Sequence, residues 1–182
     1  MTDTYSMTIA GVQRKLPLFE IKPGVRIAIL NILGDTELVS AASKALAVQI
    51  APKNPEVLVT AEAKSIPLAY ALSDEMSLPY IVLRKSLKPY MGDALRAETL
   101  SITTGKPQTL YLDEKDQSLI AGKQVALIDD VISTGSTLQG MHLLMDKAHA
   151  QVVAEAAILT EGDRAKWTNV IALGHLPVWV DE

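Results

Sequence analysis

The sequence predicts an α/β fold in which a central, mainly parallel sheet is flanked by helices. Short apolar runs of strand length alternate with longer segments of helical period, and the short runs are almost continuously apolar. Such runs are typical of parallel strands covered on both faces, because a strand with one wet face alternates apolar and polar residues. The chain of 182 residues contains no repeat and no linker, so we expect a single domain over residues 1–182.

Four segments are predicted as strands of this sheet, and their alternation with helices favours right-handed crossovers. Residues 1–34 and 85–110 do not follow the alternation, although a strand-like TLYL occupies residues 109–112. The four strands are 56–60 (EVLVT), 80–84 (YIVLR), 125–129 (VALID) and 152–159 (VVAEAAIL).

Three helices are predicted between these strands. The first begins at Asp35 or Thr36, since both residue types cap helix N-termini. Pro67 fits the first turn of the second helix, and the third follows residue 137. Their buried stripes are expected at Leu38, Ala42, Ala45, Leu46 and Ile50, at Leu68, Ala69, Leu72 and Met76, and at Leu138, Met141, Met145 and Ala148.

Composition excludes several classes of function. The net charge of −4 argues against a broad electrostatic grip on nucleic acid, so we expect no nucleic-acid partner. The absence of cysteine excludes disulfides and thiolate metal sites. No apolar stretch approaches the about 20 residues of a membrane helix, and Met1–Ala10 lacks the pattern of a signal peptide. We therefore expect a cytoplasmic protein without a membrane partner.

The stretch VALIDDVISTGST (125–137) predicts an anion site. The strand carries Asp129 and Asp130 to its carboxyl end, where open parallel sheets bind their ligands. The following loop enters a helix, whose first N–H groups can converge on a phosphate. Ribose hydroxyls would satisfy the two carboxylates, so a sugar phosphate explains both halves, whereas a simple helix cap after two surface aspartates is the alternative. The predicted loop consists of Ser133, Thr134, Gly135, Ser136 and Thr137.

These thirteen residues resemble the signature of the type I phosphoribosyltransferases, which bind 5-phosphoribosyl-1-pyrophosphate (PRPP). The resemblance extends from about Pro23 to Leu159 and is greatest to the adenine phosphoribosyltransferases of purine salvage. It implies a single-domain type I phosphoribosyltransferase fold with a small hood at residues 1–34 and a mobile active-site loop at 91–109. It also implies transfer of phosphoribose to a purine base, a homodimer, and Mg²⁺ held mainly through PRPP, pyrophosphate and water, with no metal-ligating residue.

Two further segments supply predicted site residues. In TAEAKSIPLAY (60–70), the resemblance makes residues 62–65 the pyrophosphate loop, which in this family often contains a non-proline cis peptide bond. LRKSLKPY (83–90) holds the densest basic cluster, which suits a departing pyrophosphate. Surface lysines on solvated turns are the alternative. We predict catalytic roles for Asp129, Asp130, Lys64 and Lys88, and substrate binding by the 133–137 loop, Glu62, Ala63, Arg84, Lys85, Val131 and Ile27.

The sequence offers few residues for base recognition. Ile27 and Val131 could hold a purine plane between them, and Phe19, the only phenylalanine, gives an aromatic stack little support. Where many adenine enzymes have SLEYGK, residues 101–106 read SITTGK, so Thr103 replaces a glutamate credited with proton transfer. Adenine is the favoured base, with xanthine or another purine as competitors. A PRPP-sensing regulator of the same fold is the alternative to an enzyme.

The remaining aromatic and histidine residues are expected to be structural. Trp167 and Trp179 are predicted to pack, and His175 to have a structural role. His142 and His149 lie seven residues apart on the third helix, too far for an i, i+4 metal pair.

Overall fold

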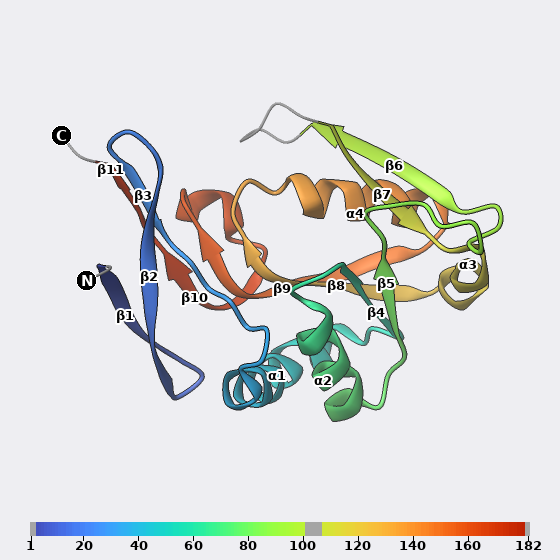
Figure 1. The fold of residues 1–182 in the computed structure, drawn as a ribbon. Helices are drawn as coiled ribbons and strands as arrows, with labels where there is room; N and C mark the ends of the chain where they lie inside the picture. The colour runs from blue at the N-terminus through green and yellow to red at the C-terminus, as the bar shows by residue number, and fades with distance from the viewer. Residues whose placement is uncertain (1–2, 101–106, 181–182) are drawn as a thin grey trace.

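A five-stranded parallel sheet forms the centre of the protein (Figure 1). The computed structural model describes residues 3–100 and 107–180. The strand order is β10-β9-β8-β4-β5, and every neighbouring pair is parallel, which confirms the predicted fold class. The strands are β4 (Val57–Ala61), β5 (Tyr80–Leu83), β8 (Gln124–Ile132), β9 (Gln151–Glu161) and β10 (Ile171–Leu176).

Helices cover both faces of this sheet. Asp35 caps α1 (Thr36–Ile50) by accepting a hydrogen bond from the backbone N–H of Leu38 at 3.1 Å, as predicted. Pro67 lies in the first turn of α2 (Ile66–Met76), and the third predicted helix is α4 (Ser136–Lys147). The short helix α3 (Glu114–Ile120) and the 3-10 turns η1 (Ala51–Lys53) and η2 (Arg164–Trp167) were not predicted.

Two apolar clusters lie on opposite sides of the sheet. One joins α1 and α2 to Leu58, Ala126 and Ile128, and the other joins α4 to Val59 and Leu127. The alternation of neighbouring strand residues between the two clusters follows from the two-residue period of a strand. The central strands are therefore buried on both faces, as their continuous apolar character predicts.

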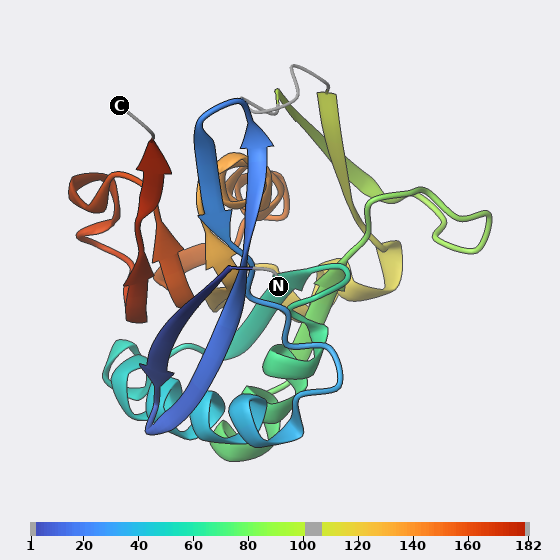
Figure 2. The same cartoon turned by 60° about the vertical axis from the view of Figure 1, so that its left-hand side comes forward.

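A second, antiparallel sheet lies beyond the left-hand end of the first in Figure 1 and comes to the front in Figure 2. We call this four-stranded sheet the hood. It consists of β1 (Thr4–Ile9), β2 (Val12–Lys22), β3 (Val25–Ala28) and β11 (Val178–Val180), in the order β1-β2-β3-β11. The sequence placed a hood at residues 1–34 and did not predict the strand contributed by residues 178–180.

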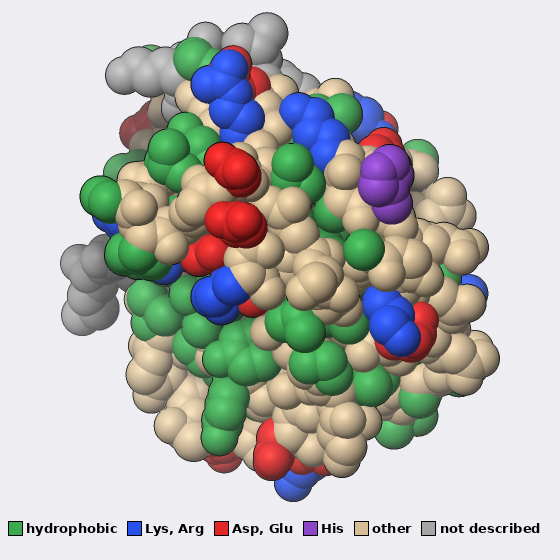
Figure 3. All heavy atoms as spheres, turned by 90° about the vertical axis from the view of Figure 1, so that its right-hand side faces the viewer, with side chains coloured by type: hydrophobic (Ala, Val, Ile, Leu, Met, Phe, Trp, Pro, Cys, Tyr) green, Lys and Arg blue, Asp and Glu red, His purple; other side chains and the backbone are tan. Residues whose placement is uncertain are grey.

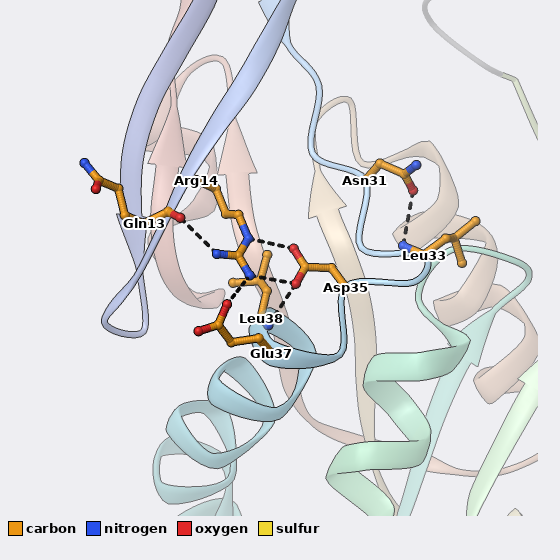
Figure 4. Close-up of polar contacts among 7 residues, drawn as sticks. All are labelled: Gln13, Arg14, Asn31, Leu33, Asp35, Glu37 and Leu38. Atoms are coloured by element: carbon orange, nitrogen blue, oxygen red, sulfur yellow. Dashed lines mark hydrogen bonds and ion pairs between the residues drawn. The ribbon is translucent and has the colours of Figure 1, made fainter.

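Arg14 ties the hood to the first helix (Figure 4). Its guanidinium on β2 donates to both carboxylate oxygens of Asp35, from Nε at 2.7 Å and from Nη2 at 2.8 Å, and to Glu37 at 2.7 Å. The hydrogen bonds from Arg14 lower the pKa of Asp35 below its usual value, and the bond from Leu38 adds to this effect. One arginine thus fixes the start of α1 against the first residues of β2.

A hairpin projects on the other side of the molecule (Figure 1). Its strands, β6 (Leu95–Leu100) and β7 (Pro107–Leu112), are antiparallel and pack on α4. Thr99 Oγ1 donates to the backbone oxygen of Ser136 at 3.2 Å, and a Cβ on Gly140 would lie 3.1 Å from Leu110. The mobile loop expected at 91–109 therefore includes β6, while residues 101–106 lie outside the described part of the chain.

The surface beside this hairpin carries acidic and basic side chains close together (Figure 3). Within residues 3–100 and 107–180, no helix is long and apolar enough to cross a membrane.

Candidate active site

Several predicted site residues line one cavity at the carboxyl end of β4 and β8. The cavity has a volume of about 260 Å³. Its walls come from the end of β8, the loop between β4 and α2, and the turn after β5. The lining residues are Ala61, Glu62, Ala63, Lys64, Ser65, Lys85, Asp129, Asp130, Val131 and Thr137.

Asp129 and Asp130 are adjacent acidic groups at the end of β8. The backbone N–H of Asp130 donates to Asp129 Oδ1 at 2.9 Å. Burial, and after it the nearby charge of Asp130, raises the pKa of Asp129 well above its usual value, while the positive charge of Lys85 opposes the shift. The carboxyl group of Asp129 is therefore poised to gain from any ligand that donates hydrogen bonds to it.

The loop from Ser133 to Thr137 turns from β8 into α4. Gly135 has φ +78°, a left-handed conformation that glycine adopts without strain. The ring of Trp167 packs against it, so that a Cβ on Gly135 would lie 2.7 Å from Trp167 Cη2. Thr134 Oγ1 and Ser136 Oγ lie 3.1 Å apart. The backbone N–H groups in the first turn of α4 and the hydroxyls of this loop suit a phosphate.

The turn after β9 holds Trp167 in place. Trp167 Nε1 donates to the backbone oxygen of Glu161 at 3.1 Å. His175 lies between Thr160 Oγ1, 2.9 Å from its Nδ1, and the backbone oxygen of Gly162, 3.1 Å from its Nε2. Both rings therefore have the packing and structural roles expected of them.

The loop at residues 62–65 is fixed by buried hydroxyls. The peptide bond between Glu62 and Ala63 is cis, as the resemblance implies. Thr60 Oγ1 lies 2.8 Å from both Ser65 Oγ and the backbone oxygen of Ile128, and Ser65 Oγ donates to the backbone oxygen of Ala61 at 3.0 Å. This bridge joins the loop to β8 one residue before Asp129, and the sequence did not predict Thr60 in that role.

Glu62 connects this loop to the basic turn after β5. Arg84 Nε donates to Glu62 Oε2 at 2.6 Å, and the backbone N–H of Lys85 donates to Oε1 at 2.5 Å. Burial acts to raise the pKa of Glu62, but these hydrogen bonds, with the charges of Arg84 and Lys88, outweigh it and lower the pKa. Arg84 and Glu62 thus brace each other.

The lysines differ in their positions around the cavity. Lys64 and Lys85 are exposed and line it, whereas Lys88 is half-buried and absent from its lining. Lys88 is close enough for its charge to act on Glu62. Arg84 lines a second cavity, between β5 and α3.

The residues predicted to contact a base lie on two sheets. Val131 pairs with Leu159 near the end of β8, and Ile27 belongs to the hood strand β3. Strand β10 ends level with β9, since Leu176 pairs with Glu161, and the chain then leads into β11, where Val178 pairs with Ile27. This connection places the hood beyond the carboxyl ends of the central strands, which is also where the cavity lies. Thr103 and Thr104 lie outside the described residues.

Metal binding by side chains alone finds no support in residues 3–100 and 107–180. No group of three or more His, Asp or Glu side chains in these ranges could hold a metal ion.

Comparison with known proteins shows a match over most of the chain. A family model described as the phosphoribosyl transferase domain matches residues 30–171. The purine biosynthesis transcriptional repressor PurR of Bacillus subtilis is 32% identical over 143 residues, covering 79% of this chain and 49% of the repressor. A hypoxanthine/guanine phosphoribosyltransferase of Methanococcus voltae is 34% identical over 110 residues, covering 60% of this chain and 55% of that protein. The chain thus spans about half the length of these curated relatives.

Solved structures share the fold at lower identity. The adenine phosphoribosyltransferase of Giardia lamblia, complexed with 9-deazaadenine, has a TM-score of 0.69 at 17% identity and covers 94% of this chain and 93% of its own. The adenine phosphoribosyltransferase of Thermoanaerobacter pseudethanolicus has a TM-score of 0.68 at 17% identity and covers 95% of both chains.

Proposed function

Because the chain belongs to the phosphoribosyl transferase domain family, we propose that it transfers phosphoribose from PRPP to a purine base, releasing pyrophosphate and a nucleoside 5′-monophosphate. The observation that carries the proposal is the cavity shared by the carboxylates of β8, Thr137 at the end of the phosphate loop, and the 62–65 loop with Lys85. The whole phosphate loop lines a second, smaller pocket, which shares Asp129, Val131 and Thr137 with this cavity. Acceptors for ribose hydroxyls therefore lie between donors for two phosphate groups.

Each part of PRPP has a partner in this arrangement. The N–H groups and hydroxyls of residues 133–137 hold the 5′-phosphate. Asp129 and Asp130 accept hydrogen bonds from the ribose hydroxyls and stabilise the positive charge that develops on the ribose as its bond to pyrophosphate breaks. Lys64, Lys85 and Lys88 neutralise the departing pyrophosphate. Positioning and electrostatics supply most of the catalysis.

Magnesium fits this site as an ion carried by the substrate. Mg²⁺ prefers oxygen ligands and keeps several waters, and it is commonly held by one or two carboxylates together with phosphates. The two aspartates beside the phosphate loop meet that description. The ion would supply further neutralisation of the pyrophosphate charge.

The favoured base is adenine, with xanthine or another purine as competitors. Support for a purine comes from the hypoxanthine/guanine and adenine phosphoribosyltransferases that the chain resembles in sequence and in fold. We also propose that the protein is a homodimer and that it is located in the cytoplasm. Because residue 103 is threonine and not glutamate, either another group of the protein accepts the proton or the purine substrate differs from adenine.

The decisive assay supplies the purified protein with Mg-PRPP and each of adenine, hypoxanthine, guanine, xanthine and orotate, and measures pyrophosphate. Release with a purine and not with orotate is expected. No release with any base would overturn the enzymatic proposal.

A PRPP-sensing regulator is the second candidate. The resemblance to the purine repressor of Bacillus subtilis, at 32% identity over 79% of this chain, favours it. Saturable PRPP binding by calorimetry, without pyrophosphate release from any base, would support the regulator over the enzyme.

A further inference from the structure

A cavity separate from the candidate active site lies beside the edge strand β10. Its volume is about 410 Å³, within the range of small-molecule sites. It shares no lining residue with the cavity that contains Asp129 and Lys85 or with the pocket of the phosphate loop. The proposed transfer reaction therefore does not use it. The lining residues are Thr160, Arg164, Trp167, Thr168, Val170, Ala172, Leu173, Gly174 and His175.

Strand β10 contributes a free hydrogen-bonding edge to this cavity. Among the described residues, β10 is the last strand of the central sheet and pairs only with β9. The backbone N–H of Gly162 donates to the Leu176 carbonyl at 3.1 Å, so the carbonyl of Leu176 faces β9. Successive residues of a strand turn their N–H and C=O groups to opposite sides, so those of Leu173 and His175 point away from β9. A ligand can thus meet a carbonyl acceptor next to an N–H donor.

The indole ring of Trp167 lines the cavity and is fixed at both ends. Its Nε1 donates to the backbone oxygen of Glu161 at 3.1 Å. The opposite end of the ring lies against Gly135, where a Cβ would be 2.7 Å from Cη2. The ring packs on the core beside α4 and is only half-buried. A flat ligand can therefore stack on an aromatic surface that is already in place, which reduces the entropic cost of binding.

Arg164 on η2 supplies a positive charge to the same cavity. Its side chain is exposed, and within residues 3–100 and 107–180 it has no ion-pair partner. The preceding carboxylate, Asp163, caps the turn by accepting from the backbone N–H of Ala165 at 3.0 Å. A guanidinium presents planar donors that match the two oxygens of a carboxylate. The charge of Arg164 therefore favours an acidic ligand.

We propose that this cavity binds a flat bicyclic heterocycle that carries a carboxylate and an amide edge. The amide edge has an N–H beside a C=O and pairs with the free backbone groups of Leu173 and His175. The rings stack on Trp167, and the carboxylate binds Arg164. A ligand in this position also holds the indole against Gly135 and so stabilises the phosphate loop. Only this last step rests on the proposed function.

Three probe compounds separate the parts of such a ligand. Pterin-6-carboxylate has the rings, the amide edge and the carboxylate, whereas pterin lacks the carboxylate and 2-naphthoate lacks the amide edge. Calorimetry with the wild-type protein should give the tightest binding for pterin-6-carboxylate. Loss of the charged contact should make pterin bind about tenfold to 100-fold more weakly, and 2-naphthoate should also bind more weakly. Equal affinities for the three compounds, or no binding of pterin-6-carboxylate, would overturn the inference.

Substitutions in and beside the cavity locate the bound compound. Arg164→Met should reduce the affinity for pterin-6-carboxylate to that for pterin, and should leave pterin binding unchanged. Lys166→Met is the matched control, because Lys166 is exposed on the same turn and does not line the cavity. Thr168→Trp should fill part of the cavity and abolish binding of both pterins, while thermal unfolding verifies that each variant is folded. Binding that is insensitive to both Arg164→Met and Thr168→Trp would reject the site.

The affinity for ribose 5-phosphate tests the connection to the phosphate loop. Saturating pterin-6-carboxylate should raise this affinity about fivefold or more in wild type and leave it unchanged in Thr168→Trp. An unchanged affinity in wild type would overturn the effect on the loop. No binding of ribose 5-phosphate with or without the pterin would reject the proposed phosphate site, whereas the pterin measurements would still decide the second cavity.

Discussion

Trp167 and Gly135 are in direct contact, although 31 positions separate them in the sequence. The indole ring occupies the space that a side chain on Gly135 would need. The turn after β9 thus limits the shape of the loop that precedes α4. The shape of the proposed phosphate site therefore depends on both segments, on the indole ring of Trp167 and on the absence of a side chain at Gly135.

We predict that Gly135→Ala lowers the affinity for ribose 5-phosphate about tenfold or more, because the new methyl group forces the loop or the indole to move. Gly122→Ala is the matched control, since Gly122 has φ +73° and a Cβ there would meet nothing within 4 Å. Both substitutions carry the backbone cost of a left-handed alanine, about 1 kcal/mol. Calorimetry and thermal unfolding measure the two effects. Equal affinities of the two variants would contradict the prediction.

Substitution of Asp129 by Asn should stabilise the free protein and weaken PRPP binding. The raised pKa of Asp129 means that folding favours its protonated form, so its contribution to stability is present in acid and is lost as the pH rises through the raised pKa. The melting temperature of Asp129→Asn should therefore exceed that of wild type increasingly between about pH 4 and pH 8, by about 2–4 °C for each kcal/mol.

Binding changes in the opposite direction for the same variant. Above the raised pKa of Asp129, where its carboxylate is charged, the loss of a charged hydrogen bond to ribose should cost about 1.5–3 kcal/mol in PRPP affinity. Asp74→Asn, on the exposed side of α2, should change neither quantity. A variant that binds PRPP as tightly as wild type would refute the role of Asp129.

Arg14→Met should lower the melting temperature at neutral pH, because it removes the guanidinium that joins β2 to Asp35 and Glu37. The pKa of Asp35 is lowered in the folded protein, so the contribution of this pair is present at neutral pH and is lost as the pH falls through the lowered pKa. The difference between variant and wild type should therefore shrink in acid.

Arg96→Met is the control for this prediction. Arg96 also lies on a hairpin, but its side chain is 70% exposed and its ion pair with Glu98 is 3.9 Å long. Exposed pairs of this kind contribute little. An equal effect of the two substitutions, or a difference independent of pH, would show that the contacts of Arg14 do not stabilise the hood.

Residues 91–109 should exchange amide hydrogens faster in the free protein than in the complex with PRPP and a base analogue. The reason is that closure over bound substrates would exclude water from the reaction. Hydrogen exchange with mass spectrometry compares the two states, and peptides from α1 provide an internal reference. Equal protection in both states would assign this segment a structural role instead.

Four of the five strands of the central sheet were predicted because their information is local, whereas the edge strand β10 was not predicted. The runs at 56–60 and 125–129 are apolar on both faces, and Asp35 and Pro67 mark the starts of their helices in the sequence itself. Residues at the carboxyl ends of these parallel strands could be placed together, because such ends meet on one side of a sheet. The cavity accordingly contains Asp129, Asp130, Lys64 and Lys85.

The missed features depend on contacts between distant segments. Thr60 reads as an ordinary strand residue until β8 places the Ile128 carbonyl beside its hydroxyl. The helix α3 has only seven residues, too few for a helical period to be distinguished. The pairing of Ile27 with Phe19 and with Val178 was not predicted, because the register between strands from separate segments cannot be read from either segment alone.

The hood also sets an order of events during synthesis. Strands β1 to β3 leave the ribosome well before β11, which pairs with the outer edge of β3 and comes from residues 178–180. A nascent chain therefore presents the edge of β3 unpaired until almost all of the described residues have been translated. Unpaired strand edges invite association with other chains, so this edge is exposed to misassembly until residues 178–180 have been translated.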